Sequence, residues 1–540
     1  MDGPSATPPH DVRQEPVPLD LAHGTFSSHP PWLVDPETMP WRTGLDEVRA
    51  RVRRSVPRLV APRRLPPGRR VGLTVWTLGR AVGGWWMVGR RRGGSASKAD
   101  LSHRIRVAME RLGPTYIKLA QIISAGEGLF PPELTDEMKR CRDRVTPEPF
   151  EVVMSTLQRE LGRDPGEVFA HIDPVARAAA SIAQVHEARL VTGEEVVVKV
   201  QRATVGERVG DDLRVLAWLA PHLVGRIPVA ALANPPALVE MFANTISEEL
   251  DFRLEAENLL DVARVLRELA QDDWVIPRPH PVLVSPRMLV MERVGGFAFE
   301  DVAGMTTAGV DTHAVVRNVM IAFLESATLY GIFHGDFHGG NLFVQDDGKV
   351  ALLDFGITAR MTDRERGAFL RLMVGGTTNN IRLQMSAMRD LGALPPDTDL
   401  DAVIADLGLA EPVVDPTTLS QEELLAEVQR VTKALLAYGA RMPKVLMLFV
   451  KNMIFLSTMI EHLAPDIDVI GEVQQIGLRF AIEHGQRIAS ESGLTLDADD
   501  VDMTGFKASL GLEADTDAIT YAQLRKRREL ILKRMGGTEV

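Results

Sequence analysis

The stretch that most constrains this chain is FHGDFHGGNLFVQDDGKVALLDFG, at residues 333–356. Asp336 precedes Asn341 by five residues, and a polar turn at 345–348 separates two short apolar runs before Asp354. This spacing predicts a β-hairpin that brings both carboxylates and the amide to one end of a two-stranded ribbon. Because Mg²⁺ prefers hard oxygen ligands, Asn341 and Asp354 are the candidate metal ligands. Asp336 is left to accept a proton or to orient a nucleophile.

Phosphate transfer at such a hairpin calls for a lysine on an upstream strand and a helical glutamate that holds this lysine. Lys199 lies in the β-branched run EVVVKV, and Glu255 lies in a later segment of helical pattern. A lysine in a strand is commonly only an edge residue that reaches water. In this chain, however, the order along the sequence is of protein-kinase type: Lys199, Glu255, Asp336, Asn341 and Asp354.

One expected feature is replaced. No G-x-G-x-x-G motif precedes Lys199, and an alanine-rich run at 178–184 stands in its place. Methyl groups limit how closely backbone amides approach phosphate, and alanine also favours ordinary helix. The position just before a strand hairpin favours a modified nucleotide loop. The cofactor-binding residues expected in this loop are Ala178, Ala179, Ala180 and Ser181.

Composition excludes several classes of protein. The chain has 540 residues, 45% of them hydrophobic and 25% charged, as in soluble globular proteins. A single cysteine excludes an intramolecular disulfide and suits a reducing compartment, and no signal-peptide pattern opens the chain, so we expect a cytoplasmic protein. Residues 1–98 carry 16 basic and 8 acidic side chains, while the whole chain has net charge −12. An acidic body of this kind predicts no nucleic-acid partner.

The N-terminal region suggests a lipid partner. Residues 1–65 are rich in proline and arginine and are predicted to be disordered. Residues 66–98 hold an apolar run with Trp76, Trp85 and Trp86, flanked by arginines and interrupted by Arg80. This pattern predicts a segment that lies at a membrane surface, because a central arginine disfavours spanning. The alternative is a helix docked on the folded body.

The chain resembles the UbiB/ABC1/ADCK family of atypical kinases. The resemblance rests on AAASIAQVH (178–186), VVVKVQR, ELDFRLEAEN, HGDFHGGN followed by DFG, and GPTYIKLAQIIS (113–124). The last segment is similar to the family's K-x-G-Q helix, which implies that Lys118 and Gln121 cover the site. The family's E-x-D pair maps onto Glu249 and Asp251, with Glu249 expected to meet Lys118.

The resemblance implies further properties. It implies ATP and Mg²⁺ as cofactors, and an adenine-contacting hinge at Met291, Glu292 and Val294. It also implies membrane lipid or isoprenoid-quinone lipids and quinone-biosynthesis proteins as partners, at the inner face of the cell membrane. Three residues depart from the family pattern: Ala120 replaces a glycine, and Phe337 and Gly339 replace prolines.

The expected fold is α+β and bilobal, of protein-kinase type. The expected units are a disordered segment (1–65), a membrane-surface segment (66–98), a helical extension (99–160), a small β-containing lobe (161–297), a helical large lobe (298–490) and a tail with a basic helix (491–540).

Three functions remain open. The first is an ATPase or kinase of the UbiB type, and the second is a small-molecule phosphotransferase similar to aminoglycoside or choline kinases. The third is a nucleotide-gated lipid scaffold without turnover.

Overall fold

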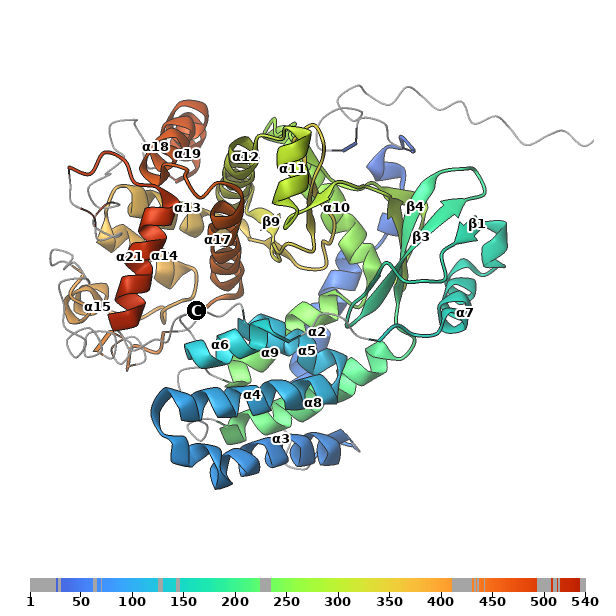
Figure 1. Ribbon diagram of the computed structural model, residues 1–540, viewed down its shortest axis with the longest axis horizontal. Helices are drawn as coiled ribbons and strands as arrows, with labels where there is room; N and C mark the ends of the chain where they lie inside the picture. Colours follow the sequence, from blue (N-terminus) through green and yellow to red (C-terminus); the bar gives the residue numbers. More distant parts are fainter. Residues whose placement is uncertain are drawn as a thin grey trace, which may run out of the picture.

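The computed structural model shows a bilobal α+β protein with an additional layer of helices (Figure 1). It describes residues 26–27, 31–61, 66–68, 70–124, 130–141, 146–223, 235–409, 430–431, 434, 437–440, 442–492, 507, 512 and 515–534. The predicted fold class is confirmed.

The small lobe is built on an antiparallel sheet whose strand order is β1-β3-β4-β7-β6, with β2 paired to β3. Alternating β-branched residues in β4 place Val196, Val198 and Val200 on the buried face. The predicted hairpin between β3 and β4 is confirmed, and Gly193 supplies the positive φ of 108° that its turn requires. The strands are β1 (Phe169–Ile172), β2 (Ala178–Ala179), β3 (Ala183–Leu190), β4 (Glu195–Gln201), β6 (Pro279–Ser285) and β7 (Met288–Glu292).

Helix α7 (Phe150–Leu161) belongs to this lobe. Its Val153 and Leu157 pack in one core with Val196 and Val290 of the sheet. The sequence placed residues 150–160 in the helical extension. That boundary was wrong, because a helix with one apolar stripe does not reveal which neighbour covers the stripe. A short 3₁₀ turn, η4 (Pro165–Glu167), follows α7.

A layer of helices forms the lower part of Figure 1, and it combines helices of the predicted extension (99–160) with α3, α8 and α9 from outside that range. Helices α3 and α4 pack along each other, α4 and α5 contact α6, and α8 packs on α9. Gly113, at φ 103°, separates α4 from α5. The elements are α3 (Arg70–Met87), η3 (Gly89–Arg92), α4 (Gly94–Leu112), α5 (Pro114–Ser124), α6 (Pro132–Lys139), α8 (Val205–Leu223) and α9 (Pro235–Glu248).

The predicted disorder of residues 1–65 was wrong for the part that the structure describes. Helix α2 (Leu45–Leu59) packs against α9 and α8, with Leu45 and Val56 buried. Two short 3₁₀ turns, η1 (Pro36–Thr38) and η2 (Pro40–Arg42), precede it. An apolar residue on each turn of α2 is sufficient to dock it, and the many arginines hid that period in the sequence. Residues 1–25 lie outside the described part.

The large lobe is mostly helical and includes the short strand β5, which precedes β7 in the sequence. A four-stranded sheet of order β5-β11-β10-β8 and the pair β9–β12 carry the hairpin predicted at 333–356. Helix α10 (Phe252–Glu268) links the two lobes. The strands are β5 (Trp274–Val275), β8 (Phe297–Ala298), β9 (Ile332–His334), β10 (Leu342–Val344), β11 (Val350–Leu352) and β12 (Thr358–Arg360). The helices are α11 (Val302–Ala308), α12 (Thr312–Glu325), α13 (Asp363–Thr377), α14 (Ile381–Asp390), α15 (Leu400–Asp406), α17 (Lys444–Leu463), α18 (Val469–Arg479), α19 (Gly485–Ser492) and α21 (Tyr521–Arg534), with π-helical turns η6 (Ser326–Tyr330) and η7 (Phe480–His484).

Helix α17 is, among the described residues, the one helix with the length and apolar composition of a membrane span. In the fold it packs on α12 and β12, beside the β9 region (Figure 1). Asn452, in the middle of α17, is fully buried and hydrogen-bonded to the loop that follows β9. These contacts make α17 a core helix of the large lobe.

Candidate active site

Lys199 connects the two lobes. It lies on β4, between β3 and β7 in the sheet order, so it is not an edge residue. Its Nζ is 2.6 Å from Oε1 of Glu255 on α10 and 3.1 Å from Oδ2 of Asp354 in the large lobe. A charge in a central strand is tolerated when such partners surround it. The structure therefore brings together three of the residues predicted from the sequence.

The surroundings favour the charged forms of Lys199 and Asp354, whereas burial raises the pKa of Glu255 from 4.5 to about 7 although Lys199 opposes this shift. Burial alone would lower the pKa of the Lys199 ammonium, but the carboxylates of Asp354 and Glu255 outweigh it and raise that pKa above its ordinary value. Burial alone would raise the pKa of Asp354. The ammonium of Lys199 and the backbone N–H of Gly356 outweigh this effect and hold that pKa below its usual range.

The candidate metal ligands lie at one end of the β10–β11 hairpin. Leu342 pairs with Leu352 in this hairpin, and the N–H of Leu353 donates to the carbonyl of Asn341 at 3.0 Å. The side-chain Nδ2 of Asn341 donates to the carbonyl of Asp336 at 3.3 Å, which leaves its Oδ1 without a hydrogen bond in the described part of the chain. The side chain of Asp354 is 45% exposed. An amide oxygen and an accessible carboxylate are a donor set that fits Mg²⁺.

The loop after β9 is held by aromatic packing. His334 stacks on Phe337 with ring centroids 5.1 Å apart, and its Nδ1 accepts a hydrogen bond from the N–H of Asp336. Phe337 is buried and also contacts Phe323. This packing explains why an aromatic residue can replace a proline there. A Cβ on Gly339 would lie 2.5 Å from Oε1 of Glu300, the end of an exposed side chain that can move, and 3.1 Å from Cδ1 of Phe299.

The alanine-rich run forms a strand and a turn, which excludes its reading as helix. Ala178 and Ala179 form β2, and the N–H of Ala180 donates to the carbonyl of Ala183, which closes the turn. Ser181 is buried in this turn. Arg202 holds the turn, since its Nε donates to the carbonyl of Ala180 at 3.0 Å. The sequence did not single out Arg202.

The residues predicted to form the hinge lie at the end of β7 and just after it, but one of their side chains points elsewhere. Met291 and Glu292 end β7, and Val294 follows in the connection to the large lobe. The Glu292 carboxylate accepts hydrogen bonds from Ser27 and from the N–H of Arg278. It is therefore engaged by these partners, and any contact with adenine by Glu292 would come from its backbone.

Helix α5 lies against the site through Lys118. Its Nζ is 3.0 Å from Oε1 of Glu249, as the resemblance implies. Burial alone would lower the pKa of Lys118, but Glu249, Asp336 and Asp354 outweigh it and raise that pKa. Ala120 is completely buried, so its methyl group is accommodated in the packing.

Gln121 and Asp251, the other two residues predicted from these motifs, are not part of the ion pair between Lys118 and Glu249. Gln121 lies one turn after Lys118, partly buried, and its side chain has no hydrogen bond within the described residues. Asp251 is the N-cap of α10, where it accepts from the N–H of Arg253 and pairs with the Arg253 guanidinium at 2.7 Å. The structure thus pairs Lys118 with Glu249 and gives Asp251 a capping contact.

Three polar residues that the sequence did not assign hold the site in place. Lys451 of α17 forms an ion pair with Asp336. The side chain of Asn452 bonds the backbone on both sides of Asp336, at His334 and at Phe337. Nδ2 of Asn258 on α10 donates to the carbonyl of Phe355 at 2.9 Å. The sequence signal that could have found Lys451 and Asn452 is a lysine next to an asparagine in an otherwise apolar helical run. Polar groups that are buried in such a helix need partners.

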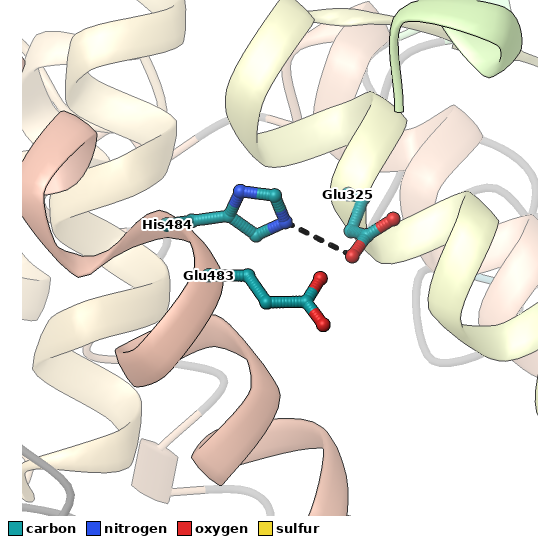
Figure 2. Close-up of side chains that lie close together, drawn as sticks. All are labelled: Glu325, Glu483 and His484. Carbon is teal, nitrogen blue, oxygen red and sulfur yellow. Dashed lines mark hydrogen bonds and ion pairs between the residues drawn. The ribbon is translucent and has the colours of Figure 1, made fainter. Parts of the chain in front are cut away.

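A second charged cluster lies between α12 and η7. Glu325 of α12 and Glu483 and His484 of η7 point toward one another (Figure 2), with ligand atoms within 4.8 Å. Oε1 of Glu325 already accepts hydrogen bonds from His484 at 3.0 Å and from Arg479 at 2.8 Å. Because the Arg479 guanidinium and His484 already bond the carboxylate, this cluster is an ion-pair network around the buried Glu325 that fixes η7 to α12.

Comparison with protein families and with known proteins identifies relatives of this chain. Residues 140–386 match the ABC1 atypical kinase-like domain. An uncharacterized protein of Mycobacterium tuberculosis is 33% identical over 377 residues, which cover 68% of this chain and 75% of that protein. An uncharacterized aarF domain-containing protein kinase of Arabidopsis thaliana, described as chloroplastic, is 29% identical and covers 72% and 78% of the two chains. A probable protein kinase UbiB of Xylella fastidiosa is 28% identical and covers 68% and 67%.

Among solved structures, that of a Mycobacterium tuberculosis protein in complex with erythromycin is 22% identical, with a TM-score of 0.36, and covers 64% of this chain and 90% of that one. Two of these relatives, those of Arabidopsis thaliana and Xylella fastidiosa, are named protein kinases, the type of protein that the motifs at Lys199, Glu255 and Asp354 predicted. The family expected from the motifs is therefore confirmed, and the chain belongs to the ABC1/UbiB family of atypical kinase-like proteins.

Proposed function

We propose that this protein binds Mg²⁺-ATP and transfers its terminal phosphoryl group to water or to a hydroxyl acceptor at a membrane surface. The observation that carries the proposal is the contact of Lys199 with both Glu255 and Asp354 across the two lobes. An ammonium held between two carboxylates at this position serves phosphate binding in kinase-type sites. The loop with Asp336 and Asn341 stands at the same hairpin.

Each residue has a stated part in this proposal. Lys199 holds the phosphates of the nucleotide, and Glu255 fixes the position of Lys199. Asn341 and Asp354 would hold Mg²⁺, which neutralises phosphate charge when it is bound. Asp336 accepts the proton of the attacking water or hydroxyl. The turn at 180–182 covers the nucleotide.

The test is ATP hydrolysis by the full chain with and without lipid vesicles. We expect Lys199→Met and Asp336→Asn to lower kcat by about 100-fold or more, as removal of one charge-stabilising group does in other enzymes. Lys349→Met, in the exposed turn of the same hairpin, is the control and should retain wild-type activity.

Two outcomes would point to the other functions. Phosphorylation of soluble amino or hydroxy compounds at enzyme-like rates would favour the small-molecule phosphotransferase. If the wild type, Lys199→Met and Asp336→Asn all bind nucleotide and have equal activity, the result would favour the nucleotide-gated lipid scaffold without turnover.

The membrane part of the proposal rests on α3. One face of this helix is docked through Val71, Thr74, Thr77 and Ala81. Trp85 also points inward, since its Nε1 donates to the carbonyl of Ser97. The other side exposes large apolar residues, next to Arg80 and the arginines of η3: Leu73, Val75, Trp76, Trp86, Met87 and Val88. Exposed tryptophan beside arginine is typical of segments that lie at the surface of an anionic bilayer.

Co-sedimentation with anionic phospholipid vesicles tests this surface. Trp76 and Trp86 are 62% and 63% exposed, so Trp76→Ser/Trp86→Ser should weaken vesicle binding several-fold without unfolding the protein. Val191→Ser/Val282→Ser removes comparably exposed residues from the small lobe and is the control. Equal binding of both double variants would refute a membrane role of α3.

The lipid context that we propose is isoprenoid-quinone metabolism, and the UbiB relatives and the sequence motifs support it. Cells in which the wild-type copy is replaced by Asp336→Asn should accumulate less quinone than cells with Lys349→Met. Unchanged quinone content would separate the phosphotransfer activity from this pathway.

A further inference from the structure

The catalytic loop lacks a cation of its own. Between Asp336 and Asn341 the residues are Phe337, His338, Gly339 and Gly340, without lysine or arginine. The Nδ1 of His338 accepts the N–H of Gly340 at 3.1 Å. A phosphoryl group in transfer carries negative charge on its oxygens, which positive groups around it must balance. Lys199 contacts Asp354 and Glu255 and makes no contact with Asp336 among the described residues.

A lysine from a distant helix reaches this position. Nζ of Lys451, in the middle of α17, contacts Oδ1 of Asp336. The two side chains are only 20% and 18% exposed. Burying a lysine in an apolar helix is costly unless it is paired, so the position is defined by its contact with the loop. An ammonium carries three protons, and Asp336 is the one partner of Lys451 within the described residues.

The neighbouring residue fixes helix and loop to each other. Oδ1 of Asn452 accepts the N–H of Phe337 at 3.1 Å, and its Nδ2 donates to the carbonyl of His334. Asn452 is fully buried. Together, Lys451 and Asn452 bind the segment 334–337 on both sides of the Asp336 side chain, so Lys451 has little freedom to leave the loop.

We propose that Lys451 supplies the cation that the catalytic loop lacks: it orients Asp336 and faces the terminal phosphate of the bound nucleotide. This inference rests on the proposed function. In the step that it assists, the acceptor oxygen forms a bond to the terminal phosphorus and the bond from that phosphorus to the leaving ADP oxygen breaks. Asp336 receives the proton of the acceptor, and Lys451 keeps its own protons throughout.

The first test is steady-state ATP hydrolysis by the full-length protein with anionic vesicles. Lys451→Met should lower kcat by about 100-fold and raise the KM for ATP by less than about 5-fold, because the main loss is in the transition state. Lys451→Arg should recover at least about a tenth of the wild-type kcat. Lys444→Met is the matched control, since Lys444 lies on the same helix but pairs with Glu248 at 3.2 Å; it should stay within about twofold of wild type.

The second test needs no turnover. Affinity is measured for Mg²⁺-ADP and for a non-hydrolysable ATP analogue. Since only the analogue has a terminal phosphate, Lys451→Met should weaken its binding several-fold and leave ADP binding unchanged. A purely structural lysine would change both affinities together, and Lys451→Arg would then rescue neither.

The outcomes separate the two proposals. Wild-type kcat in Lys451→Met, or equal losses for ADP and the analogue, overturns the role of Lys451 and leaves the proposed function standing. A wild-type protein that binds neither nucleotide overturns the proposed function, and the inference with it. If the wild-type protein binds nucleotide but does not hydrolyse it, the second test alone decides whether Lys451 contacts the terminal phosphate.

Discussion

At the scale of single residues, Gly335 has no room for a side chain. A Cβ there would lie 2.8 Å from Cγ2 of Ile357 and 3.2 Å from the carbonyl oxygen of the same residue. Gly335→Ala should therefore lower the free energy of unfolding by about 1–3 kcal/mol, the usual cost of overpacking, and this can be measured by urea denaturation.

The control for this prediction is Gly376→Ala. Gly376 lies in α13 with no atom near its missing Cβ. Gly376→Ala should leave the free energy of unfolding unchanged or raise it by up to about 1 kcal/mol, because alanine has a higher helix propensity than glycine. Equal effects of the two variants would contradict the steric explanation.

Asn258 carries a second prediction at this scale. Its Nδ2 bonds the carbonyl of Phe355 at 2.9 Å, and its Oδ1 accepts from Arg360 at 2.7 Å. Asn258→Ala leaves the buried carbonyl of Phe355 without this partner and removes one acceptor of Arg360, which keeps its ion pair with Asp261, and should cost about 1–3 kcal/mol of unfolding free energy. Asn244→Ala, at an exposed position of α9, should cost less than about 0.5 kcal/mol in the same urea titration.

The residues predicted from the sequence share one property. Lys199 and Asp354 stand in short motifs whose local structure fixes their direction, so spacing was sufficient to find them. Lys451 is 115 residues from Asp336, and only the packing of α17 on the loop brings the two together. A charge in an apolar run showed that Lys451 needed a partner, but the sequence could not identify which one.

At the scale of elements, β6 contains a histidine held neutral. Nδ1 of His280 accepts the N–H groups of Val282 and Leu283 at 3.1 and 3.0 Å. Burial lowers the pKa of His280 from 6.5 to about 4, and Glu194 opposes this shift. Between these pH values the unfolded chain binds a proton that the folded chain does not, so stability falls as the pH drops through this window.

The expected size and the test follow. The loss should reach at most about 3 kcal/mol between pH 7 and pH 4 from this group. His280→Asn keeps an acceptor for both N–H groups, as in an Asx-turn, and removes the titration. Its unfolding free energy, measured by urea titration from pH 7 to pH 4, should depend less on pH than that of the wild type. An unchanged pH dependence would show that other groups dominate.

Elements were predicted best where the pattern was clear. The β3–β4 hairpin and the β10–β11 hairpin at 333–356 follow from short apolar or β-branched runs separated by turn residues. Helix α2 was missed because arginines fill its exposed face and proline surrounds it. The partner of α7 was missed because a stripe of apolar residues does not say which surface it covers.

At the scale of the whole molecule, charge is unevenly distributed. Residues 1–98 carry a net charge of +8 and the rest of the chain −20. Attraction of the basic part to anionic lipid is screened within about 10 Å at 0.1 M salt. Raising the salt from 0.05 to 0.3 M should therefore weaken vesicle binding about 10-fold or more in co-sedimentation.

Nucleotide affinity, which depends on partly buried contacts around Lys199, should change by less than about threefold over the same range. Vesicle binding that is insensitive to salt would show that the tryptophans of α3 act without the arginines.

The segment that matches the ABC1 family ends at residue 386, whereas α17 begins at Lys444. A gene fragment trimmed to the recognised region would leave out Asn452, and His334 and Phe337 would lose the amide that bonds their backbone. We expect an expression clone that ends at residue 386 to yield poorly folded, inactive protein. Such a failure would say nothing about whether the intact protein is an enzyme.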